Sequence, residues 1–145
     1  MIDKMQEEDL DAVAAIEAQV FSMPWSKKGF ADTLSMRNVI FLTAKEDGVV
    51  KGYCGIYLAA DEGEITNVAV APAFRRQQVA SHLLEKLLKM AKQEGTRRFI
   101  LEVRCSNEPA IHLYEKYGFL VQGIRKGFYE QPKEDAYVML LSKDQ

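Results

Sequence analysis

The sequence predicts a mixed α/β fold in which helices cover both faces of a central sheet. Segments with helical spacing and strand-like apolar runs alternate along the chain. A helix of about 17 residues joins two of these runs, "GEITNVAV" and "RFILEV". A connection of that length lets the two runs lie parallel, whereas short turns make antiparallel neighbours. We therefore expect a sheet that is mostly antiparallel and has one parallel pair.

The N-terminal part predicts two helices. Apolar residues recur at helical spacing over residues 10–20 after the acidic start "EEDLD", which suits the positive end of a helix dipole. The segment "FSMPW" interrupts this pattern, and we expect its Trp25 to be exposed. Ser26 can then cap a second, short helix that carries Phe30 and Leu34.

The rest of the chain predicts the strands and two further helices. The segment "VIFLTAKEDGVVKGYCGIYLAA" reads as two strands around Asp47-Gly48, a strong hairpin signal. A long helix is expected over about residues 78–94, and another over 107–117, which Asn107 can cap. The last two strands lie near "FLVQGIRKGF" and "AYVMLL". The expected order is βααββββαβαββ.

Length and composition are those of one ordinary globular domain, expected over residues 1–145. The 19 Lys and Arg against 21 Asp and Glu give a formal net charge of -2, which argues against a nucleic-acid-binding protein. No apolar stretch resembles a signal peptide or a membrane span, so we expect a cytoplasmic protein. Cys54, Cys105 and the two histidines show no metal-site spacing, and no metal is expected.

Two arginines, Arg75 and Arg76, stand directly before the long helix. The first N–H groups of a helix have no partner within it, and the helix dipole adds partial positive charge there. Cations at that end are unfavourable unless an anion lies between them and the amides, and phosphate is the common case. The alternative is a solvated basic turn, and the pattern alone leaves both interpretations open.

Two residues are candidates for acid-base chemistry. Glu102 lies in "RFILEV", a run apolar enough to be buried on both faces, where a carboxylate is costly unless it is paired or used. A salt bridge to Arg104 or Arg98 is the structural alternative. Tyr114 falls on the apolar stripe of its helix, where a core aromatic is the default and the hydroxyl needs a partner.

A different chemistry would use Cys105. With His112 and Glu102 it supplies the residue types of a thiol hydrolase, namely a nucleophile, a base and an orienting acid. Cys105 follows its strand without a recognisable nucleophile elbow, however, and His112 lies beside the apolar stripe of its helix. We therefore rank this interpretation below the acid-base one.

These segments resemble the GNAT family of acyl-CoA-dependent N-acetyltransferases. The order of elements matches over essentially the whole chain, and "RRQQVA" follows the family motif Arg/Gln-x-x-Gly-x-Gly/Ala, with Gln78 in place of the first glycine. An amide with ordinary helical dihedrals can still donate a hydrogen bond there. The segments "FSMPWS", "EITNVAV", "LEVRCSNEPAIHLYEKYGF" and "GIRKGFY" are similar to the RimI-type members, which acetylate the N-terminal alanine of a ribosomal protein.

The resemblance implies acetyl-CoA as co-substrate, a ribosomal protein as partner, and direct attack by the α-amine of that protein. It implies Glu102 as the base, acting through water, and Tyr114 as the acid that protonates the leaving thiolate. It also implies a set of groups that hold the cofactor: the backbone of Val68, Ala69 and Val70 along the pantetheine arm, then Arg75, Arg76, Gln77, Gln78, Val79 and Ala80 around the pyrophosphate, and Asn107.

The substrate side is expected at the loop after the first helix and at the C-terminal strand pair. Trp25 interrupts the pattern of its neighbours, and Glu130, Glu134 and Asp135 form an acidic cluster that could attract a basic peptide. A packing tryptophan and a solvated hairpin are the alternatives. Two other functions stay open: an acetyltransferase of a small-molecule amine or internal lysine, and a non-catalytic acyl-CoA-binding partner subunit.

Overall fold

The computed structural model describes residues 1–142 of the 145-residue chain. The elements, in chain order, are β1 (Ile2–Lys4), α1 (Leu10–Val20), α2 (Lys27–Leu34), β2 (Val39–Glu46), β3 (Val49–Ala59), β4 (Glu62–Val70), α3 (Val79–Gln93), β5 (Arg98–Arg104), α4 (Glu108–Lys116), β6 (Leu120–Glu130) and β7 (Lys133–Ser142). Two short 3-10 helices precede α1 and α3. Four strands were expected between α2 and α3, but the chain forms three there, β2, β3 and β4.

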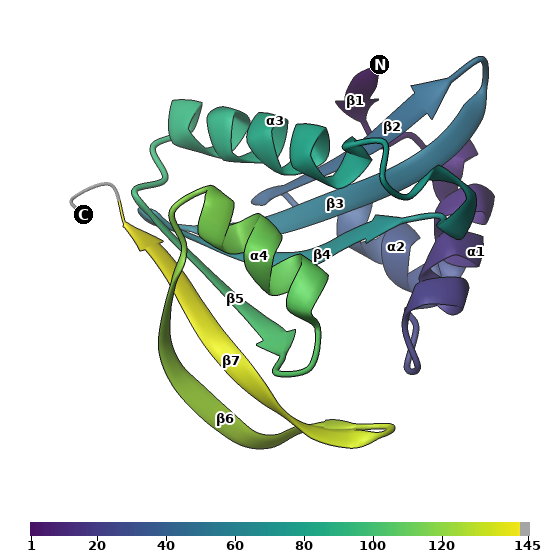
Figure 1. Cartoon of the computed structure of the whole chain (residues 1–145). Coiled ribbons are helices and arrows are strands. Elements are labelled where there is room, and N and C mark those ends of the chain that lie inside the picture. Colours follow the sequence, from purple (N-terminus) through teal and green to yellow (C-terminus); the bar gives the residue numbers. More distant parts are fainter. Residues whose placement is uncertain (143–145) are drawn as a thin grey trace.

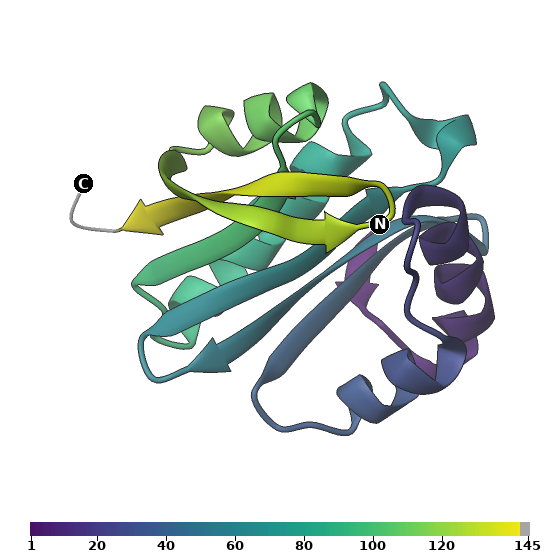
Figure 2. The same ribbon diagram turned by 90° about the horizontal axis from the view of Figure 1, so that it is seen from below.

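Within the described residues, seven strands form one sheet in the order β1-β2-β3-β4-β5-β7-β6. Only β4 and β5 pair in parallel, and every other neighbouring pair is antiparallel. Helices α3 and α4 cover one face of the sheet, and α1 and α2 cover the other face at its β2 to β4 side (Figures 1 and 2). The predicted mostly antiparallel sheet, with one parallel pair and helices on both faces, is confirmed.

Local signals set the ends of several elements. Asp47 and Gly48, in the turn between β2 and β3, have φ angles of 53° and 80°, the left-handed pair that a tight hairpin requires. The Ser26 Oγ accepts a hydrogen bond from the Gly29 N–H at 3.1 Å and so caps α2. At α4, the Asn107 Oδ1 likewise accepts from a backbone N–H at 3.3 Å, so this predicted cap is confirmed.

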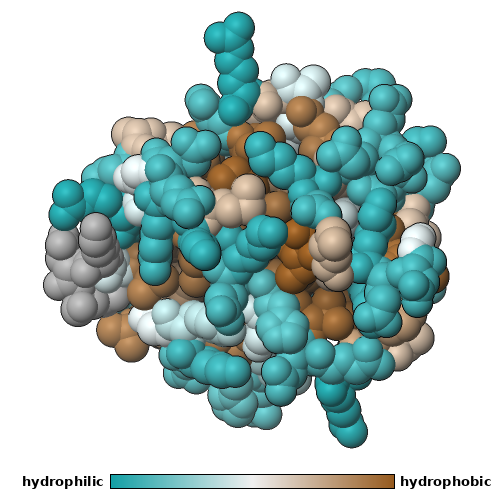
Figure 3. Space-filling view, turned by 90° about the horizontal axis from the view of Figure 1, so that it is seen from above, coloured by the Kyte–Doolittle hydropathy of each residue, from teal (hydrophilic) through white to brown (hydrophobic). Residues whose placement is uncertain are grey.

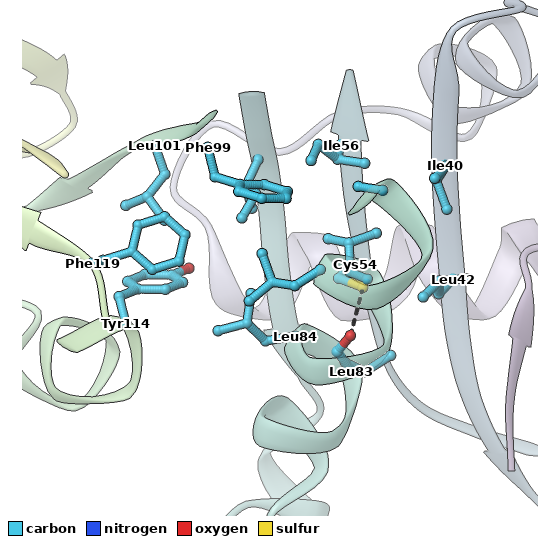
Figure 4. Close-up of a cluster of buried hydrophobic side chains, with 14 of the residues drawn as sticks. Ile40, Leu42, Cys54, Ile56, Leu83, Leu84, Phe99, Leu101, Tyr114 and Phe119 are labelled. Atoms are coloured by element: carbon cyan, nitrogen blue, oxygen red, sulfur yellow. Dashed lines mark hydrogen bonds between the residues drawn. The ribbon is translucent and has the colours of Figure 1, made fainter. Parts of the chain in front are cut away.

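The main core lies between the sheet and helices α3 and α4 (Figure 4). Leucines of α3 and the aromatic rings of Tyr114 and Phe119 pack there against apolar side chains of β2, β3 and β5. A second core, around Phe30, Phe41 and Tyr53, lies under α1 and α2. The outer side of α3 is charged, and the view onto it shows hydrophilic side chains with apolar surface between them (Figure 3). Each helix therefore buries one face against the sheet.

Strands β4 and β5 separate after a short parallel stretch. Three register pairs join them: Glu62↔Arg98, Gly63↔Phe99 and Glu64↔Ile100. On its other side β4 stays paired with β3 as far as Val70. The backbone groups of residues 65–70 that point toward β5 therefore have no strand partner among the described residues. No described helix is long and apolar enough to cross a membrane.

Gly55 of β3 tests how tightly the second core is packed. A Cβ atom added there would meet the ring carbons of Phe41, whereas one added at Gly123 of β6 has no heavy atom within 4 Å. We expect Gly55→Ala to lower the free energy of unfolding by about 1–3 kcal/mol, because the ring must leave its place in the core. Gly123→Ala should change it by about 0.5 kcal/mol or less. Urea unfolding of the two variants measures this difference, and equal stabilities would contradict the packing described.

Candidate active site

The separation of β4 and β5 creates an opening in the middle of the sheet. Val68, Ala69 and Val70 all lie on β4 beyond its last pair with β5. Their backbone groups on the β5 side are free to accept another extended chain, as the edge of a sheet does. Val68 and Val70 pack toward α3 and α4, whereas Ala69 belongs to the core under α1 and α2. The unpaired edge of β4 therefore lies between the two cores.

The basic turn before α3 leads directly into this opening. Among the described residues, no group accepts a hydrogen bond from the backbone N–H of Arg76 to Ser81, and the start of α3 has no side-chain cap. Arg75, Arg76, Gln77 and Gln78 are all exposed. The turn thus offers a row of free amides beside two guanidinium groups, an arrangement that fits an anion such as a phosphate.

Gln78 differs from its expected conformation. Its φ of 63° and that of Arg76, 66°, lie in the left-handed region, so neither residue has ordinary helical dihedrals, and α3 begins at Val79. Side chains other than glycine adopt this region at a cost of about 1–3 kcal/mol, and such strain persists mainly at functional sites. The chain therefore keeps the backbone shape that the motif's glycine favours, although Gln78 has a side chain. A surface cavity of about 410 Å³ lies between the turn and strands β1 to β3, and its lining includes Gln77, Val79 and His82 on one side and Ala44, Lys45 and Lys51 on the other.

Glu102 points away from the main core. Along β5, Leu101 and Val103 are buried against α3 and α4, and Glu102 between them faces the other side of the sheet. Burial on both faces was expected, but this face is only partly buried, because no helix of the described residues packs on this side of β5. The Glu102 side chain is 15% exposed and accepts a hydrogen bond at 3.2 Å from Arg125 of β6, not from Arg104 or Arg98. A half-buried, paired carboxylate therefore stands beside the opening.

Tyr114 approaches the opening from the opposite face. It is buried in the main core, where its ring meets that of Phe119 edge-on at 5.7 Å between centroids. Figure 4 shows its hydroxyl pointing away from α4, toward the space beside Leu84. No described residue forms a hydrogen bond with this hydroxyl. Burial raises the pKa of Tyr114 above its usual value of 10, so the phenol stays protonated at neutral pH.

The structure does not support the thiol-hydrolase interpretation. Burial, followed by the nearby charges of Asp135 and Glu134, raises the pKa of Cys105, whereas a nucleophilic cysteine needs a lowered one. His112 is exposed on α4. Cys105 is therefore a protonated thiol without an activating cation, and the acid-base interpretation of Glu102 remains.

The two segments expected on the substrate side, the loop after α1 and the β6–β7 hairpin, are joined through Arg104. Arg104 on β5 donates hydrogen bonds to the Ser22 Oγ in the loop after α1 at 3.3 Å and to the carbonyl oxygens of Gln131 and Pro132 in the β6–β7 turn at 3.0 and 2.9 Å. Its guanidinium also lies 4.2 Å from the centroid of the Tyr129 ring. Sequence reasoning considered Arg104 only as a partner of Glu102, and nothing in its local pattern indicates this tethering role.

The proposed substrate residues are less free than expected. Trp25 is half-buried rather than exposed and packs on Phe30 with ring centroids 5.2 Å apart. Glu134 pairs with Arg104 at 3.2 Å and accepts from a backbone N–H at 2.7 Å, and these contacts lower the pKa of Glu134. Glu130 is exposed on the hairpin. The acidic cluster is therefore partly neutralised within the protein.

A buried polar network beside the opening escaped sequence reasoning. The carboxylate of Glu17 on α1 accepts hydrogen bonds from the Trp25 N–H at 2.8 Å, from the Asn67 Nδ2 at 3.0 Å and from the Tyr53 hydroxyl. The buried Asn67 Oδ1, by contrast, has no donor among the described residues. The sequence did contain a signal of this burial, because Glu17 lies four residues after Val13, on the apolar face of its helix. This network fixes the loop after α1 against the unpaired part of β4.

Comparisons with known proteins agree with this geometry. A model of the acetyltransferase (GNAT) family matches residues 10–119. A Bacillus subtilis (strain 168) protein, provisionally named ribosomal protein bS18-alanine N-acetyltransferase, is 40% identical over 95% of this chain and 92% of its own length. The Escherichia coli (strain K12) enzyme named ribosomal protein bS18-alanine N-acetyltransferase is 34% identical over 97% of this chain and 95% of its own length.

The structural comparison leads to the same family. The crystal structure of the ribosomal-protein-S18-alanine N-acetyltransferase from Escherichia coli superposes with a TM-score of 0.90 at 33% identity and covers 98% of this chain and 92% of that one. The family match spans residues 10–119, which is most of the sequence. The chain belongs to the GNAT family of acetyltransferases.

Proposed function

We propose that this protein transfers the acetyl group of acetyl-CoA to the α-amine of a protein N-terminus, and that its substrate is the N-terminal alanine of a ribosomal protein similar to bS18. The observation that carries the proposal is the similarity to the Escherichia coli enzyme of that name along nearly the whole of both chains. We place the reaction in the cytoplasm, where ribosomal proteins are made, and assign it to one domain over residues 1–145.

The residues around the opening fit acetyl-CoA, which supplies an activated acyl thioester when it is bound. The free amides from Arg76 to Ala80, with the Arg75 and Arg76 guanidinium groups beside them, suit a pyrophosphate. The unpaired edge of β4 at Val68 to Val70 suits the two amide groups of the pantetheine arm. We assign Asn107, at the start of α4, to the same ligand.

Glu102 is assigned as the proton acceptor. An α-amine with a pKa of about 8 is roughly one-tenth neutral at pH 7, whereas a lysine with a pKa of about 10.4 is less than one-thousandth neutral. That difference corresponds to about 3 kcal/mol, so a single carboxylate is a more adequate base for an α-amine than for a lysine. Glu102 takes one proton from the substrate ammonium, directly or through water, and the neutral nitrogen then attacks the acyl carbon without a covalent enzyme intermediate. The nitrogen loses a second proton to water as the carbon–sulfur bond breaks, which leaves a neutral amide.

Tyr114 is assigned to the leaving group. Its hydroxyl, protonated and without a protein partner among the described residues, can donate a hydrogen bond to the sulfur as the carbon–sulfur bond breaks. A free thiol has a pKa of about 8.5, so proton transfer from the buried phenol is uphill. Tyr114 therefore acts mainly as a hydrogen-bond donor and gives up its proton late.

A substrate panel tests the proposed function. Release of free coenzyme A should be rapid with a short peptide that begins with alanine, and absent with the same peptide acetylated at its N-terminus or with a polyamine. Turnover of the N-blocked peptide at an internal lysine, or of the polyamine, would instead favour the alternative acetyltransferases. Tight acetyl-CoA binding without turnover of any amine would favour a non-catalytic partner subunit.

Reversing the charge of the turn before α3 should weaken cofactor binding. The Arg75→Glu, Arg76→Glu double variant removes two charge-assisted contacts worth about 1.5–3 kcal/mol each, so the acetyl-CoA dissociation constant should rise at least about tenfold. Lys89→Glu with Lys92→Glu is the matched control, because it makes the same change of charge on the exposed far half of α3. Calorimetry measures the acetyl-CoA dissociation constant of both variants. An equal effect in the two would show that the turn does not bind the cofactor.

Removing the Tyr114 hydroxyl should slow the reaction without affecting binding. Tyr114→Phe keeps the ring that packs on Phe119, so kcat should fall at least about tenfold while KM for the peptide changes little, as expected for a contact made mainly in the transition state. Tyr117→Phe, at the C-cap of the same helix, is the control, because its hydroxyl bonds instead to the Ser81 carbonyl and Glu85. Full activity of the Tyr114→Phe variant would show that Tyr114 serves only to pack the core.

A further inference from the structure

A second carboxylate lies beside Glu102 on the same face of the sheet. Glu64 of β4 is in register with Ile100 of β5, so their side chains are neighbours on one face. Glu102 follows Ile100 by two residues and therefore points to that same face. Ile65 next to Glu64, and Leu101 next to Glu102, are buried in the main core on the opposite face. Glu64 and Glu102 thus stand on the two strands at the point where they separate.

The two carboxylates are not equally neutralised. Glu102 pairs with Arg125 at 3.2 Å. Glu64 has no basic side chain within ion-pairing distance in the described part of the chain, although its side chain as a whole is exposed. Partial burial of its carboxylate and repulsion from Glu102 raise the pKa of Glu64, and the more distant Arg125 opposes this. The pair with Arg125 therefore leaves one negative charge uncompensated at the opening.

No helix of the described residues covers this charge. Helix α1 packs on β3 and β4 and α2 on β2, and Figure 2 shows no described helix over β5 on the Glu102 face. On this face β6 supplies Arg125 to Glu102, and Arg104 ties the loop after α1 to the β6–β7 turn through Ser22 and Gln131. An uncompensated carboxylate beside the strand separation favours a cationic ligand.

We propose that Glu64 anchors the α-ammonium group of the acceptor substrate and is a specificity-determining residue distinct from Glu102. The inference rests on the proposed function, since it assumes an acceptor with a free α-amine. At pH 7 about nine-tenths of such amines carry a proton, so the group that first reaches the site is a cation. Glu64 holds this cation beside Glu102, which then removes one proton.

Glu64 and Glu102 are assigned different roles because only Glu102 forms an ion pair with Arg125. Arg125 already engages one Glu102 oxygen, so Glu102 alone has limited capacity to bind a second cation and also accept its proton. Glu64 is free to accept N–H hydrogen bonds from the ammonium. A neutral acceptor, or one whose amine is blocked, loses these charge-assisted bonds and leaves Glu64 unpaired. Glu64 therefore selects for the charged N-terminus, and Glu102 carries out the chemistry.

Steady-state kinetics of Glu64→Gln and Glu102→Gln with the alanine-starting peptide test this division. Glu64→Gln should raise the KM for the peptide at least about tenfold and change kcat less than about threefold. Glu102→Gln should lower kcat by about 10² to 10⁴-fold with little change in KM. Glu62→Gln is the matched control, because it removes the same charge two residues earlier on β4, where Glu62 lies 3.7 Å from Arg98.

A change on the ligand side isolates the contact. With coenzyme A present, wild-type protein should bind the C-terminally labelled peptide more tightly than an analogue in which a hydroxyl replaces the α-amine. Glu64→Gln should abolish most of this difference, and Glu62→Gln should preserve it. Thermal melting confirms that the variants fold.

The outcomes separate the two proposals. If wild-type protein turns over the peptide but Glu64→Gln leaves both KM and the amine preference unchanged, the role of Glu64 is overturned and the proposed function stands. A fall in kcat alone would also overturn the anchoring role, because Glu64 would then act on the proton. If wild-type protein neither acetylates nor prefers any free α-amine, the proposed function fails and this inference fails with it.

Discussion

The early end of the β4–β5 pairing is the constraint on which the rest of the site depends. Parallel strands joined by a helix normally stay paired along their length, because each backbone N–H and C=O needs a partner. Here pairing ends at Glu64 and Ile100, and side chains from α3 and α4, among them Leu84 and Tyr114, fill the core side of the separation (Figure 4). The backbone of β4 is left with unused hydrogen-bonding groups that a ligand can satisfy.

This separation divides the charge of the molecule between two faces. The free amides and arginines before α3 make one approach to the opening positive, whereas Glu64 and Glu102 make the other negative. A chain with a formal net charge of only -2 can therefore attract an anionic donor and a cationic acceptor without their competing for one surface. On the proposed function, the two substrates meet only where the strands part.

More features of the fold than of the site could be predicted from the sequence. The hairpin at Asp47-Gly48 and the cap at Asn107 were predicted correctly because both depend on neighbouring residues alone. The partner of Glu102 could not be predicted, because Arg125 reaches it only through the placement of β7 between β5 and β6. Trp25 was wrongly expected to be exposed, since the aromatic rings on which it packs come from other elements.

The two outer strands of the sheet bear on how the protein behaves at high concentration. A long, regular outer strand invites pairing with another chain and so promotes aggregation. Here β1 has three residues, and β6 is broken by register shifts after Val121 and again between Arg125 and Tyr129. Apolar side chains such as Ile124 and Phe128 are exposed on β6, but its irregular backbone prevents a second copy from forming a continuous ladder along it. The register shifts of β6 thus reduce the tendency of this outer strand to pair with a second copy of the chain.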